Sequence, residues 1–174
     1  MNFKYLYVIG CLAVSSLVYS QQNIFDVERF GTVEDVKALM TINTDTINSV
    51  EKSGYSPLIL ACYKGNDDVA MFLAEKVCDV NVGGENGTAL MAAVYKNRET
   101  IVKTLLDFGA DPNIADANRT TPMHYAVIMR NTQVIELLLR ADADFTLKDG
   151  SGKTAKEYAS MTQNETIIEL FEKE

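Results

Sequence analysis

The sequence contains no tryptophan, one histidine and three cysteines among its 174 residues. A single histidine leaves little material for a histidine-based metal site or a proton relay between side chains. Lysine and arginine number 16 against 24 aspartates and glutamates, so the formal net charge is −8. This balance argues against binding to nucleic acid or to an anionic membrane surface, since both need clusters of cationic side chains. We therefore expect no metal, no other cofactor and no nucleic-acid partner. We also expect no membrane association of the mature chain, which begins after the first twenty residues described below.

The first twenty residues differ from the remainder of the chain. Lys4 precedes an uncharged, mostly apolar stretch from Tyr5 to Tyr19, and polar sequence begins at Gln21. This pattern is typical of a cleavable secretory signal peptide. A retained anchor helix is the first alternative, but the run is short for a bilayer span of about 20 residues. The second is lipidation at Cys11, although almost no apolar sequence precedes that cysteine. The pattern predicts a signal peptide over residues 1–20 and a mature chain that is periplasmic or secreted.

What the sequence does contain is a recurring helix start. In Thr121-Pro122-Met123-His124, a hydroxyl residue precedes a proline and apolar residues follow at helical spacing. The hydroxyl suits an N-cap, and proline is tolerated at the first helical position because its missing N–H has no partner there. Equivalent starts occur at Ser56, Thr88 and Thr154, about 32 or 33 positions apart. A fixed period of this size indicates a stacked-repeat protein.

Each repeat follows one plan. In the third unit a short helix from Thr88 to Lys96 carries small residues, and a second helix from Glu99 to Phe108 has apolar residues on one face. Gly109 then suits the left-handed position that ends a helix. The first helix spans only about two turns, which is too short to persist alone, so each unit depends on its neighbours to cover its apolar face.

These units resemble ankyrin repeats. The Thr121-Pro122-Met123-His124 segment and the closing Gly109-Ala110-Asp111-Pro112-Asn113 segment carry the most specific part of the resemblance. The resemblance implies an all-α solenoid of about five stacked helix-turn-helix repeats, with atypical capping repeats at the two ends. Residues 21–174 then form one domain, with repeats at approximately 23–51, 52–83, 84–116, 117–149 and 150–174.

The resemblance also bears on the reactive side chains. It implies a structural role for Thr121 and His124, in which the imidazole bonds to the threonine cap and to a neighbouring loop. No cysteine or serine is arranged as a partner for His124 in catalysis, so we expect the protein not to be an enzyme. Cys62 and Cys78 stand where the family usually has a small buried alanine, which favours buried free thiols. A disulfide between them stays open as an alternative, because the chain is expected to be exported.

Proteins of this family usually bind through the loop tips and the concave face of the first helices. Carried over by position, this surface includes the following residues: Lys52, Tyr55, Tyr63, Lys64, Tyr95, Lys96, Asn118, Ile128 and Met129. The two Tyr-Lys pairs stand at equivalent positions in adjacent repeats and are expected to line up. Tyrosine, methionine and a long cation are good interface material, and a cationic stripe on an acidic protein favours a partner with an acidic patch.

The sequence therefore predicts a non-catalytic protein–protein interaction module, a scaffold or adaptor, that is monomeric and acts in the periplasm or outside the cell. One alternative is an inhibitor or immunity protein that occludes a toxic or lytic envelope enzyme. Another, of a different class, is a structural stress-protection protein without a fixed partner. The identity of the partner does not follow from the sequence, because one repeat fold serves many unrelated partners.

Overall fold

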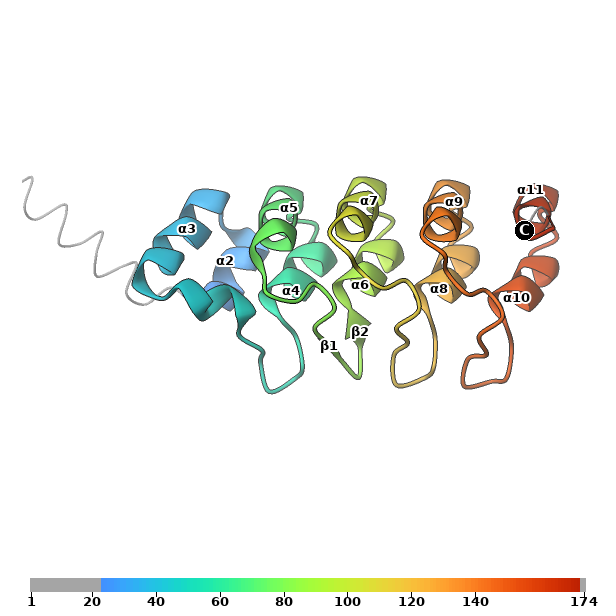
Figure 1. The fold of residues 1–174 in the computed structure, drawn as a ribbon, viewed down its shortest axis with the longest axis horizontal. Coiled ribbons are helices and arrows are strands. Elements are labelled where there is room, and N and C mark those ends of the chain that lie inside the picture. Colours follow the sequence, from blue (N-terminus) through green and yellow to red (C-terminus); the bar gives the residue numbers. More distant parts are fainter. Residues whose placement is uncertain (1–22, 173–174) are drawn as a thin grey trace, which may run out of the picture.

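The computed structural model describes residues 23–172, which form an extended row of helix pairs (Figure 1). The expected signal peptide over residues 1–20 and the candidate lipidation site Cys11 lie outside the described residues. Each pair sits beside the next in chain order, and contacts run from first helix to first helix and from second helix to second helix. Among the described residues no helix is both long and apolar enough to span a bilayer.

The described helices fall into pairs of a first and a second helix. The first helices are α2 (Ile24–Phe30), α4 (Pro57–Lys64), α6 (Ala89–Tyr95), α8 (Pro122–Ile128) and α10 (Ala155–Met161). The second helices are α3 (Val33–Ile42), α5 (Asp67–Lys76), α7 (Glu99–Asp107), α9 (Thr132–Arg140) and α11 (Glu165–Leu170). A 3₁₀ helix, η1 (Thr44–Asn48), follows α3 and was not expected from the sequence.

The predicted helix starts are confirmed at the four hydroxyl residues. The hydroxyl oxygens of Ser56, Thr88 and Thr154 each accept the backbone N–H three residues further along, at 3.3, 3.4 and 3.1 Å. Thr121 is the N-cap of α8, and prolines occupy the first position of α4 and of α8. These bonds satisfy amide groups that have no partner within the helix.

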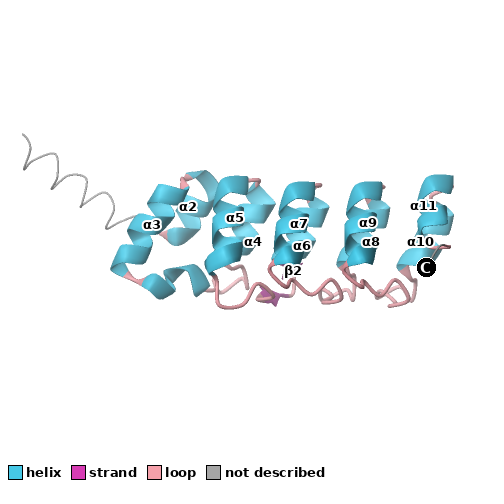
Figure 2. Ribbon diagram, turned by 45° about the horizontal axis from the view of Figure 1, so that its top comes forward, coloured by secondary structure: helices cyan, strands magenta, loops and turns pink. Residues whose placement is uncertain are grey.

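The connections between successive pairs emerge along one edge of the row (Figure 2). One of them contains the two-residue strands β1 (Gly83–Gly84) and β2 (Gly87–Thr88), which pair antiparallel. Gly87 has φ 89°, a left-handed conformation that glycine adopts without steric cost. This connection is therefore a hairpin, as expected, and α6 begins directly after it.

A continuous apolar core runs between the two layers of helices. Each second helix from α5 onward buries one aliphatic side chain at the same position of its repeat, and none of these four is exposed: Val69, Ile101, Val134 and Ile167. Their spacing matches the period of the helix starts. The core is thus built by repetition, and every unit shares its buried face with the units beside it.

The two cysteines differ, and the expectation that both are buried is wrong for one of them. Both thiols are free, Cys62 is fully buried in α4, and Cys78 is exposed. The cause lies at Val77, which stands where the next unit has Gly109. Gly109 takes φ 87°, whereas Val77 takes φ −66° and ψ 151°. Because a β-branched residue strongly disfavours the left-handed turn, the chain leaves α5 in an extended path and Cys78 faces solvent.

Candidate functional site

Three tyrosines from successive repeats form an aromatic array on the row of first helices. The rings of Tyr63 and Tyr95 are stacked with centroids 6.5 Å apart and planes within 5° of parallel. Tyr125 meets Tyr95 edge to face at 5.9 Å. Tyr63 and Tyr95 remain 42% and 45% exposed, so rings that contact one another still present large surfaces to a partner. Contacts of both kinds are favourable arrangements of aromatic pairs.

Two lysines lie against these rings. The Nζ atom of Lys96 is 4.2 Å from the centroid of Tyr63 and 5.8 Å from that of Tyr95, and Lys64 Nζ is 5.6 Å from Tyr63. The attraction between an ammonium group and a ring face holds both cations near the array. Neither lysine forms an ion pair with a carboxylate within residues 23–172. Their charges therefore remain available to a bound molecule.

Beside the array is an open groove of about 340 Å³. Its lining comes from the first helices and from the loops that precede them: Tyr55, Ile59, Tyr63, Asn86, Met91, Ala92, Tyr95 and Tyr125. The hydroxyl group of Tyr125 donates a 2.9 Å hydrogen bond to Asp116 Oδ2. Partial burial and this bond raise the pKa of Tyr125 to about 12, so the hydroxyl stays protonated and fixed in direction.

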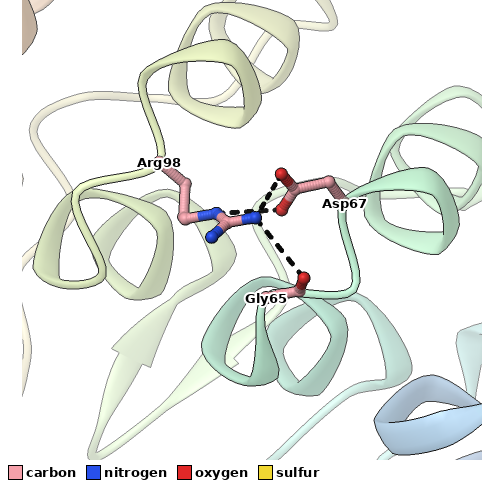
Figure 3. A network of polar contacts seen from close by, with 3 residues as sticks. All are labelled: Gly65, Asp67 and Arg98. Carbon is pink, nitrogen blue, oxygen red and sulfur yellow. Dashed lines mark hydrogen bonds and ion pairs between the residues drawn. The ribbon is translucent and has the colours of Figure 1, made fainter.

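A polar network holds the helix ends that carry the two lysines (Figure 3). Arg98 follows α6 and reaches back to the preceding repeat. Its guanidinium donates two hydrogen bonds to the Asp67 carboxylate, one of them from Nε to Oδ1 at 3.0 Å, and Nη2 donates to the Gly65 carbonyl at 3.4 Å. Gly65 directly follows Lys64, and Lys96 lies two residues before Arg98. The network therefore fixes the two lysine-bearing turns relative to each other.

The structure brings together part of the predicted site. Tyr55, Tyr63 and Tyr95 line the groove, and Lys64 and Lys96 flank it through their ring contacts. The other predicted residues do not line the groove. Lys52 and Asn118 are exposed on loops, and Ile128 and Met129, at the end of α8, are 49% and 40% exposed.

Several residues of the groove were missed by reasoning from the sequence, among them Tyr125, Ile59, Met91 and Asn86. Tyr125 is the most important, because it extends the array to a third repeat. The available signal was its place directly after His124, on the same first helix as the predicted Ile128 and Met129. Ile59 and Met91 occupy the position of His124 in their own repeats, near the start of the first helix. The predicted surface took in residues that end each first helix or lie at loop tips and therefore did not include them.

His124 is fully buried and joins two repeats. Its Nδ1 accepts the backbone N–H of Thr121 at 3.2 Å and lies 2.8 Å from the Thr121 hydroxyl oxygen, while Nε2 lies 3.1 Å from the carbonyl oxygen of Lys153. Because Nδ1 accepts from an amide, the proton resides on Nε2, which donates to that carbonyl. The imidazole has both nitrogens engaged in holding a loop to a helix start, and it is buried away from substrates.

Chemistry at other positions is limited within the described part of the chain. No cluster of three or more histidine, cysteine, aspartate or glutamate side chains there is placed to hold a metal ion. Cys62 is buried, and burial raises the pKa of its thiol far above the usual value, which disfavours the reactive thiolate. The surface around Tyr63 and Tyr95 instead offers exposed aromatic area and the positive charge of Lys64 and Lys96 for contact with another molecule.

Comparison with known proteins agrees with the helix pairs. The family described as "Ankyrin repeats (3 copies)" matches residues 25–116 and 101–174. The chain belongs to the ankyrin repeat family. Ankyrin repeats typically serve as protein–protein interaction modules, and this is the broad function that the family implies for the repeats of this chain.

Individual relatives share part of their length with this ankyrin repeat protein. Ankyrin repeat and SAM domain-containing protein 6 of Rattus norvegicus is 31% identical over 63% of this chain and 12% of its own length. A putative ankyrin repeat-containing protein of Treponema pallidum (strain Nichols) is 36% identical over 44% of this chain and 26% of its own. BCL-6 corepressor-like protein 1 of Homo sapiens is 37% identical over 56% of this chain and 6% of its own length. The chain spans about a quarter or less of these relatives' lengths.

Proposed function

We propose that this ankyrin repeat protein is a non-catalytic scaffold or adaptor that binds another protein through the first-helix surface around Tyr63 and Tyr95. The observation that carries the proposal is the array of half-exposed rings from adjacent repeats. Two lysines flank it, and neither pairs with a carboxylate of residues 23–172. Tyrosine is enriched at the centres of protein interfaces because it combines a large apolar area with a polar tip. Lysines beside the rings favour an acidic patch on the partner.

The architecture supports this proposal. We take each of the five helix pairs within residues 23–172 as one repeat, with the first and last pairs as caps. The chain acts as a monomer in this proposal, and the row of first helices presents the tyrosines from one side. In this proposal the second helices and the core support that row, and the partner contacts only the exposed residues of the first helices.

We also propose that the protein works outside the cytoplasm, in the periplasm or secreted. The support is the composition of residues 1–20, where one lysine precedes an uncharged apolar stretch that ends in small and polar residues. Mass spectrometry of the protein isolated from its natural source tests this. We expect Gln21 at the amino terminus, and a chain that keeps residues 1–20 would contradict export by cleavage.

The binding proposal is tested by affinity capture with surface variants. The double variant Tyr63→Ala, Tyr95→Ala removes two rings of the array, and Phe108→Ala is a matched control because Phe108 is 48% exposed on the end of a second helix. We expect the double variant to lose the captured partner while the control retains it, with all three proteins melting at similar temperatures. Equal capture by the double variant would place the binding surface elsewhere.

A further inference from the structure

The groove beside the tyrosines is an unfavourable site for a cation, although aromatic faces commonly attract one. The protein's own Lys96 occupies the face of Tyr63 at 4.2 Å, and Lys64 approaches the same ring at 5.6 Å. A cationic guest would have to displace these ammonium groups or be repelled by them. The charge at this end of the groove therefore selects for an anionic group.

Comparison with other lysines of the chain sharpens this point. Lys37, Lys76 and Lys103 form ion pairs with Glu34, Glu75 and Asp107, at 3.7, 2.6 and 2.8 Å. Lys64 and Lys96 form no ion pair within residues 23–172, a property that they share with Lys52, Lys148, Lys153 and Lys156. They differ in that both ammonium groups lie against one ring, that of the half-exposed Tyr63. In a chain with net charge −8, two ammonium groups on one ring, neither paired with a carboxylate of the described residues, favour an external carboxylate at this place.

The size and lining of the groove limit what can accompany that carboxylate. Its volume of about 340 Å³ lies at the low end of the range of about 300–1,000 Å³ for ligand pockets. Ile59, Met91 and Ala92 contribute apolar side chains to its lining, beside the tyrosines. This space suits one or two apolar side chains. A short extended segment can supply them together with a neighbouring carboxylate.

The groove also has a direction. Lys64 and Lys96 lie at the carboxyl ends of α4 and α6, whereas Asn86 and the Asp116-bound hydroxyl of Tyr125 lie toward the loops. An anionic group is thus favoured at the helix ends and disfavoured near Asp116. Further along the row, Ile128 and Met129 at the end of α8 add exposed apolar surface at the equivalent place.

We infer that the groove binds a linear segment of a partner protein in which acidic residues adjoin an apolar or aromatic side chain. The carboxylates pair with Lys64 and Lys96, and the apolar side chain enters between Tyr55, Tyr63 and Tyr95. This inference rests on the proposed function, since it names the kind of partner that the same surface takes.

The experiment is a selection from a random-peptide display library on the immobilised chain. We expect enriched peptides to place aspartate or glutamate beside leucine, isoleucine, phenylalanine or tyrosine. Synthetic copies should bind the double variant Lys64→Gln, Lys96→Gln about tenfold more weakly, and their binding should weaken as salt is raised. The matched control Lys76→Gln, Lys103→Gln removes two charges from second helices and should bind as the unmodified chain does.

Four outcomes would overturn the inference. Enriched peptides could be neutral or basic, acidic peptides could bind the Lys64→Gln, Lys96→Gln variant unchanged, or the unmodified chain could enrich no peptide. Binding of a single-stranded oligo(dT) probe that depends on the same lysines would also overturn it, in favour of nucleic acid. Each result leaves the proposed function standing if capture of the natural partner still requires Tyr63 and Tyr95, so the two failures can be told apart.

Discussion

At the scale of single residues, the turn that follows each second helix depends on one side chain. Gly109 and Asp142 adopt φ 87° and 58° after α7 and α9, and the alanines that follow them are buried. Val77 stands at the same place after α5 with φ −66°. The one-residue difference redirects the chain, and Cys78 is exposed with its Sγ 3.3 Å from Asn48 Nδ2.

Thiol labelling of the native protein tests this difference. Cys78 should react at the rate of an exposed thiol, and Cys62 about a hundredfold more slowly, because its burial requires the fold to open before a reagent can enter. Peptide mapping by mass spectrometry separates the two sites. In Val77→Gly, which permits the left-handed turn, labelling of Cys78 should slow several-fold. Equal rates at Cys62 and Cys78 in the unmodified protein would contradict the assignment.

Asp149 links the stability of the last repeats to pH. Its Oδ1 accepts the backbone N–H of Lys153 and of Ser151, and its Oδ2 accepts the hydroxyl of Tyr158. These hydrogen bonds, led by that from Lys153, hold the pKa of Asp149 well below its usual value. Because the pKa is lower in the folded state, the stabilisation is present above the unfolded value of about 3.9 and is lost as pH falls below it.

Urea unfolding between neutral pH and about pH 3 measures this effect. The unmodified protein should lose stability as the pH drops below about 4. In Asp149→Asn that loss should be smaller, since one carboxylate with a depressed pKa has been removed. Asp68→Asn, at an exposed position on α5, is the control and should follow the unmodified protein. An identical pH profile for Asp149→Asn would show that these hydrogen bonds do not contribute.

At the scale of the helices, neighbouring repeats are joined by polar contacts as well as by the core. The Asn48, Asn81 and Asn113 side-chain oxygens each accept a backbone N–H of the following repeat, from Cys78, Asp111 and Asp144, at 2.9, 2.8 and 2.7 Å. The Arg98–Asp67 pair connects α5 with α7 across the same kind of interface. Because hydrogen bonds are directional, such contacts fix the position of each repeat relative to the next more narrowly than apolar packing alone does.

A double-mutant cycle on Arg98→Ala and Asp67→Ala measures the second of these links. We expect a coupling energy of about 1 kcal/mol, toward the upper end for partly exposed pairs because the geometry is bidentate. The coupling should decrease with added salt. The cycle on Lys103→Ala and Asp107→Ala, an exposed pair within α7, should give about 0.3–0.5 kcal/mol. A coupling near zero for Arg98 and Asp67 would leave the repeat offset to packing and the asparagine contacts.

At the scale of the whole molecule, stability is shared along the row while its ends have a neighbour on one side only. In a stacked-repeat protein each unit is stabilised by itself and by the interfaces beside it. Leu105 in α7 and Ile167 in α11 are both fully buried, but only the first lies between two neighbouring pairs.

Truncation of these two side chains distinguishes the centre from the end. Leu105→Ala should lower the free energy of unfolding by about 2–5 kcal/mol and speed hydrogen exchange in all repeats. Ile167→Ala should speed exchange mainly in α10 and α11 and leave α4 to α9 protected. Hydrogen exchange followed by mass spectrometry resolves the two patterns. Uniform loss of protection in Ile167→Ala would mean that the row unfolds only as one unit.

The sequence by itself determined where the first helices begin, which faces are buried and in what order the units follow. Capping and amphipathic periodicity are local properties, complete within a dozen residues, so they can be read without neighbours. The alignment of the two Tyr-Lys pairs followed from the period. Only the tertiary structure decided that Tyr125 joins the groove, that Cys78 is exposed and that Arg98 binds Asp67. The Tyr125 and Arg98 contacts join residues about 30 positions apart, so they depend on the distance and direction between stacked repeats. The exposure of Cys78 depends on the backbone angles of Val77.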